Sequence, residues 1–96
     1  MSLGEKIKDF AGSIGLAATR APDNYGELSS WNYEDHMADL KELWSEIQPQ
    51  IKRDFELSAF IEEKLQEIFN AFEAGEIERG RSAAWAIYNS EFKKMR

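Results

Sequence analysis

Residues 33–51 read YEDHMADLKELWSEIQPQI, and the spacing of their apolar side chains decides the fold class. These side chains recur at steps of four and three residues, which places them on one face of an α-helix: Tyr33, Met37, Leu40, Trp44, Ile47 and Ile51. The same spacing resumes at Ile61, Leu65, Ile68 and Phe72. Asn32 or Ser30 is available to cap the first of these two helices. The spacing therefore predicts two amphipathic helices with Trp44 and Phe72 in the core.

The chain is expected to turn back between residues 48 and 58. Pro49 lacks a backbone donor, and Asp54 and Ser58 place polar groups on the otherwise apolar face. One continuous helix over residues 33–72 would be about 60 Å long, far longer than the diameter of so small a domain. Two separate helices are therefore predicted.

A further helix is predicted on each side of this central pair. Residues 3–18 place Leu3, Ile7, Phe10, Ile14 and Ala17 on one face. Interior glycines weaken this first helix, and residues 20–30 have the composition of a loop, so residues 1–30 are expected to be partly mobile. The last helix is predicted from Ile77 to Lys94, after Gly75 as a left-handed helix-ending residue.

The stretch AFEAGEIERG at residues 71–80, with Tyr88 beyond it, resembles the turn of a tetratricopeptide hairpin. The resemblance covers about twenty residues and has no copy 34 residues upstream, so it implies a helical hairpin across Gly75 and not an array of repeats.

Composition agrees with an all-α fold. The 96 residues include no valine and only one threonine, Thr19, so few side chains favour a pleated sheet. The length fits a single domain over residues 1–96. We predict a compact bundle of about four helices with a C-terminal hairpin turning at Gly75 and no sheet.

Several classes of function are excluded by the residue counts. The chain has no cysteine and one histidine, which rules out disulfide scaffolds and zinc clusters. Its net charge of −6 has the wrong sign for nucleic acid. No stretch is long and apolar enough for a membrane span, and no signal-peptide pattern opens the chain, so a cytoplasmic location is expected.

Two groups of residues are candidates for binding a partner. The last predicted helix is apolar nearly all the way round. Its bulky side holds Trp85, Tyr88, Phe92 and Met95. In a bundle of four helices from so short a chain, this side is either covered by the first helix or open to another molecule. Four acids step along one face of the helix that begins at Tyr33: Asp35, Asp39, Glu42 and Glu46. An acidic face of this kind favours encounter with a basic protein surface, and an open aromatic side would hold the complex.

We therefore predict a protein that is not an enzyme and needs no cofactor or metal. It is expected to bind another protein, as an adaptor, inhibitor or immunity-type module, or to form a homodimer through the aromatic side of its last helix. One alternative is a regulatory bundle that binds a metal or small molecule through His36 with Asp35 and Asp39. Another is a membrane-surface protein anchored by residues 3–18.

Overall fold

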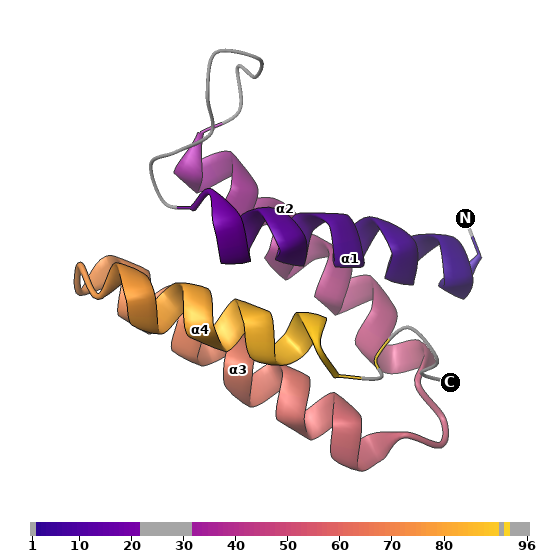
Figure 1. The fold of residues 1–96 in the computed structure, drawn as a ribbon. Helices are drawn as coiled ribbons and strands as arrows, with labels where there is room; N and C mark the ends of the chain where they lie inside the picture. Colours follow the sequence, from indigo (N-terminus) through magenta and orange to yellow (C-terminus); the bar gives the residue numbers. More distant parts are fainter. Residues whose placement is uncertain (1, 22–31, 91, 93–96) are drawn as a thin grey trace.

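The computed structural model describes residues 2–21, 32–90 and 92. Its helices are α1 (Leu3–Thr19), α2 (Tyr33–Ile47), α3 (Phe55–Glu73) and α4 (Ile77–Tyr88), with a short 3₁₀ helix, η1 (Gln48–Gln50), after α2 (Figure 1). No strand occurs in these described ranges, which confirms the all-α prediction. Most of the predicted loop at residues 20–30 lies outside them.

The first two helices, α1 and α2, start at side-chain caps. Ser2 caps α1, with its Oγ accepting a hydrogen bond from the Glu5 backbone N–H at 3.2 Å. Asn32 caps α2, with its Oδ1 accepting from the Asp35 N–H at 2.8 Å. Each cap satisfies a backbone donor that has no partner inside the helix.

The predicted break after α2 is confirmed. Pro49 lies in η1, at a helix-start position that tolerates its missing N–H. The chain is extended at Ile51, which is buried, and α3 begins at Phe55. Ile51 thus adds to the core from a connecting segment.

The predicted hairpin at Gly75 is confirmed in detail. Gly75 has φ of +79°, and its N–H donates to the Phe72 carbonyl while the Glu76 N–H donates to the Ala71 carbonyl. This pair of bonds is the Schellman arrangement, which needs a left-handed residue. Beyond the turn, Gly80 lies directly against the Phe72 ring, so α4 packs closely on α3.

The predicted end of the last helix at Lys94 is wrong, because α4 ends at Tyr88. Asn89 is the C-cap residue of the helix. The Ser90 N–H and hydroxyl both donate to the Ile87 carbonyl, so this carbonyl is already occupied and cannot accept a bond from a further helical turn. Phe92 then turns back into the core. Lys93 and Lys94, the last two residues of the predicted helix, lie outside the described residues.

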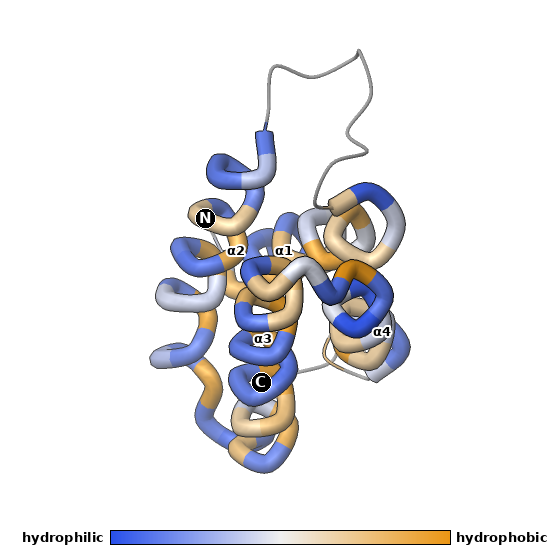
Figure 2. Tube along the Cα trace, turned by 90° about the vertical axis from the view of Figure 1, so that its left-hand side faces the viewer, coloured by the Kyte–Doolittle hydropathy of each residue, from blue (hydrophilic) through white to orange (hydrophobic). Residues whose placement is uncertain are grey.

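The core lies between the helices and contains most of the predicted apolar faces, with Leu3 and Tyr33 partly buried at its edge. Trp44 and Phe72 are both buried, as expected, and the large apolar side chains that are fully enclosed come from every helix and from Phe92 beyond α4: Phe10, Ile14, Leu40, Ile47, Ile61, Ile68, Ile87 and Phe92. Figure 2 shows α2 on one side of the bundle and α4 on the other, with α1 and α3 between them. No helix in the described part of the chain has the length and hydropathy to cross a membrane.

Candidate functional site

The aromatic side of α4 is only partly open. Trp85 is 42% exposed, and its ring meets the Tyr88 ring edge-on at 5.6 Å between centroids. Tyr88 is half-buried and its ring lies against Gly15 of α1. Met95 lies outside the described residues.

Phe92 corrects the predicted contact surface. It is 0% exposed and packs edge-on against Phe10, with 5.9 Å between ring centroids. The prediction assumed that the helix continues to Lys94, which would keep Phe92 on the same side as Trp85. Because α4 ends at Tyr88, Phe92 instead belongs to the core.

The four acidic side chains of α2 that were predicted to bind a partner divide into two groups. Asp35, Glu42 and Glu46 are exposed, and no described residue forms an ion pair with them. Asp39 is half-buried and accepts a hydrogen bond from the Ser13 hydroxyl at 3.0 Å. Asp39 therefore helps join α2 to α1 and is not part of the free acidic face.

His36 has a structural position. It is fully buried, and its Nε2 lies 2.8 Å from the Ser13 carbonyl oxygen. Because a carbonyl only accepts, Nε2 carries the proton and donates. Burial lowers the pKa of His36, against the opposing effects of the Ser13 hydrogen bond and the Asp39 charge. The imidazole is therefore neutral at pH 7.

This arrangement does not fit the predicted metal alternative. Nε2 is engaged by Ser13, Asp35 is exposed, and the described residues hold no group of three or more potential ligands. Ser13, which bonds both His36 and Asp39, was missed by the sequence reasoning. Its only signal was a polar residue beside the apolar face of the first helix.

A groove between α2 and α3 was also missed. It consists of two hollows, of about 260 and 280 Å³, that share Lys41 and Phe69. The Lys41 ammonium lies 4.8 Å from the centre of the Phe69 ring, between the two hollows. Trp44 lines the first hollow, and its Nε1 donor is buried with no acceptor in the described part of the chain. The spacing of apolar residues within each helix did not indicate this groove, because the groove depends on how α2 and α3 lie beside each other.

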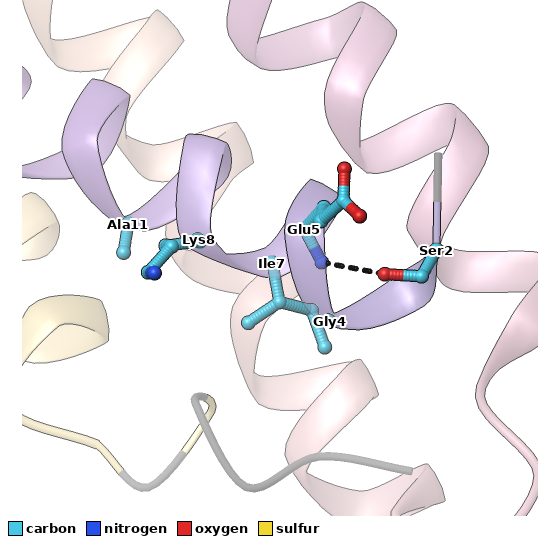
Figure 3. Close-up of a pocket in the computed structure, with 6 residues that line it drawn as sticks. All are labelled: Ser2, Gly4, Glu5, Ile7, Lys8 and Ala11. Carbon is cyan, nitrogen blue, oxygen red and sulfur yellow. Dashed lines mark hydrogen bonds between the residues drawn. The ribbon is translucent and has the colours of Figure 1, made fainter.

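A larger hollow, of about 510 Å³, lies beside the first turns of α1. Figure 3 shows its described lining, which comes from α1 and its N-cap residue: Ser2, Gly4, Glu5, Ile7, Lys8 and Ala11. One helix alone does not direct several polar groups at a common point. Ile7 and Phe10, which the membrane-surface alternative needs to be available, are both buried toward the core. The alternative is therefore not supported.

Comparisons with known proteins find no matching family model, no similar curated protein and no similar solved structure.

Proposed function

We propose that the chain is a non-enzymatic protein-binding module that recognises a basic surface of another protein. The observation that carries this proposal is the acidic face of α2, defined as Asp35, Glu42 and Glu46, whose exposed carboxylates form no ion pair with any described residue. The helix as a whole carries five acidic residues and one lysine. An unneutralised face of one sign is complementary to a basic partner.

Charge of this kind acts mainly on the rate of encounter. Exposed carboxylates raise the local concentration of a cationic partner and speed association, and salt weakens the effect because the screening length is about 8 Å at physiological ionic strength. Binding through the acidic face should therefore fall steeply as salt rises.

The test compares two double variants that each lose two negative charges, one on α2 and one on α3. The wild type, Glu42→Gln/Glu46→Gln and the control Glu56→Gln/Glu63→Gln would each be immobilised and used to capture proteins from the source organism. All four glutamates are exposed, and the control pair lies on α3. We expect a basic protein to be retained by the wild type and by the control, and to be lost from the α2 variant and in high salt.

Once that protein has been purified, its rate of association with the α2 variant should be several-fold lower than with the wild type in low salt. Its rate of dissociation should change less. Equal retention and equal rates on the α2 variant and the control would contradict the proposal.

A second candidate function, self-association, is favoured by the exposed Trp85 with its edge contact to Tyr88. A two-fold dimer would cover this ring with its own copy. Sedimentation should then show a dimer in the wild type and a monomer in Trp85→Ala. A monomeric wild type at high concentration would refute this candidate.

A further inference from the structure

The groove between α2 and α3 is a wide seam in the bundle. The closely packed helix pairs are α1 with α2, α1 with α4 and α3 with α4, and α2 with α3 is not among them. Long side chains bridge the seam instead, as Lys41 does over Phe69. Along the antiparallel pair, the groove runs from Tyr33 and Glu73 at one end to Gln48 and Glu62 at the other. It extends along α2 for about 22 Å, the length of four helical turns.

The groove combines an apolar lining with an acidic rim. Its apolar lining includes Met37, Leu65 and Phe69, beside Trp44. Three exposed glutamates stand along its edges, Glu34 and Glu73 at one end and Glu62 at the other. Lys41 is the one cation in the described lining, and its charge is directed at the Phe69 ring. The electrostatic character of the groove is therefore negative.

Trp44 supplies a separate observation that points to a ligand. Its side chain lines the groove and is only 6% exposed, and its buried Nε1 donor has no acceptor among the residues that the structure describes. Buried indole N–H groups normally find a hydrogen-bond partner, because leaving one unpaired disfavours the state that contains it. Because Nε1 itself is enclosed, an oxygen acceptor from outside the chain would remove that deficit only once the side chains over Nε1 move aside.

We propose that this groove binds a cationic, amphipathic segment of a partner protein. The segment places apolar side chains in the two hollows, sets lysine or arginine beside the rim glutamates, and offers an oxygen to Trp44 Nε1. This inference rests on the proposed function and names the site on this chain where the partner binds and the chemistry of the partner segment. The acidic face of α2 guides the approach, and the groove holds the segment.

The first test uses variants that fill the hollows without changing charge. Ser45 and Ala38 are exposed residues of α2 that line the first and second hollow respectively, and Ala59 is an exposed residue of α3 that lines neither. The probe is a fluorescein-labelled peptide of about 15 residues, with leucine, lysine and glutamine at helical spacing, long enough to span the groove. We expect Ala38→Trp/Ser45→Trp to bind it about tenfold more weakly than the wild type, and Ala59→Trp to bind it equally well.

The second test removes charge from the rim. Glu62→Gln/Glu73→Gln should weaken binding of the peptide more than Glu56→Gln/Glu63→Gln, which removes the same charge from exposed positions of α3 outside the groove. A peptide with glutamate in place of each lysine should not bind the wild type. Circular dichroism of each variant establishes that the helices are intact.

The third test observes Trp44 directly. The indole N–H resonances are assigned with Trp31→Phe and Trp85→Phe, and the peptide should move the Trp44 signal downfield while the Trp85 signal stays in place. Binding that leaves the Trp44 signal unchanged, or that Ala38→Trp/Ser45→Trp does not weaken, would overturn the groove proposal. If Glu42→Gln/Glu46→Gln nevertheless loses its basic partner, the proposed function stands and only the groove is wrong.

Discussion

Substituting alanine for Gly80 tests the closest approach in the fold. A Cβ at Gly80 would overlap the ring of Phe72, which is buried and held on another side by Tyr33, with 6.0 Å between ring centroids. Helix propensity alone predicts that the change stabilises the protein by about 1 kcal/mol. Overpacking a filled site costs about 1–3 kcal/mol, because the buried ring would have to shift to admit the new methyl group. The steric effect should therefore cancel or exceed the gain in propensity.

Gly12→Ala is the matched control. Gly12 also lies inside a helix, but it is exposed and a Cβ there would meet nothing within 4 Å. It should gain about 1 kcal/mol from propensity with no steric cost. Urea unfolding, followed by circular dichroism with equal slopes, should therefore separate the two variants by about 1–3 kcal/mol.

The combination Phe72→Leu/Gly80→Ala adds a check on the mechanism. Removing the ring creates room for the new methyl group, so Gly80→Ala should be less destabilising in the Phe72→Leu background than in the wild type. If Gly80→Ala stabilises the protein as much as Gly12→Ala does, the close packing of α4 on α3 is wrong.

Three further predictions concern the buried groups. Because burial lowers the pKa of His36, the unfolded chain binds more protons than the folded one in mild acid. The free energy of unfolding should therefore fall as the pH drops below about 6.5. Urea unfolding at pH 7.5 and 5.5 should show a smaller loss of stability in His36→Gln than in the wild type. Ser13→Ala should cost about 1 kcal/mol, measured by urea unfolding at pH 7, because Asp39 loses its hydroxyl donor while the backbone acceptor for His36 remains. Phe92→Ala should cost about 3–5 kcal/mol and Trp85→Ala less than about 1 kcal/mol in the same assay; similar losses would contradict their different burial.

The parts of the fold that could be predicted from sequence are those fixed by neighbouring residues. The apolar spacing around Trp44 and Phe72, the proline after α2 and the glycine before α4 each act through local geometry, and each prediction is confirmed. The end of α4 was not predictable from apolar spacing, because Phe92 continues the pattern. The helix ends at Asn89 and Ser90, where the Ser90 N–H and hydroxyl both donate to the Ile87 carbonyl.

The candidate site was less predictable because it depends on pairings between helices. Exposure of Glu42 and Glu46 follows from their position opposite the apolar face of α2, and the sequence was enough to find them. Asp39 steps along the same face, yet Ser13 of α1 binds it, and no spacing within α2 indicates that contact. The groove is further removed from the sequence pattern, since its lining alternates between two helices that run in opposite directions.

The arrangement of the helices also separates the two predicted parts of the binding mechanism. The acidic face and the groove belong to α2 and its neighbour α3, whereas Trp85 belongs to α4, on the opposite side of the bundle (Figure 2). Because the groove lies on α2 itself, apolar contact directly beside the acidic face is expected from the groove rather than from Trp85. The two surfaces share no side chain, so substitutions on one should leave binding at the other unchanged. If Trp85→Ala weakened capture of the basic partner as much as Glu42→Gln/Glu46→Gln does, this separation would be wrong.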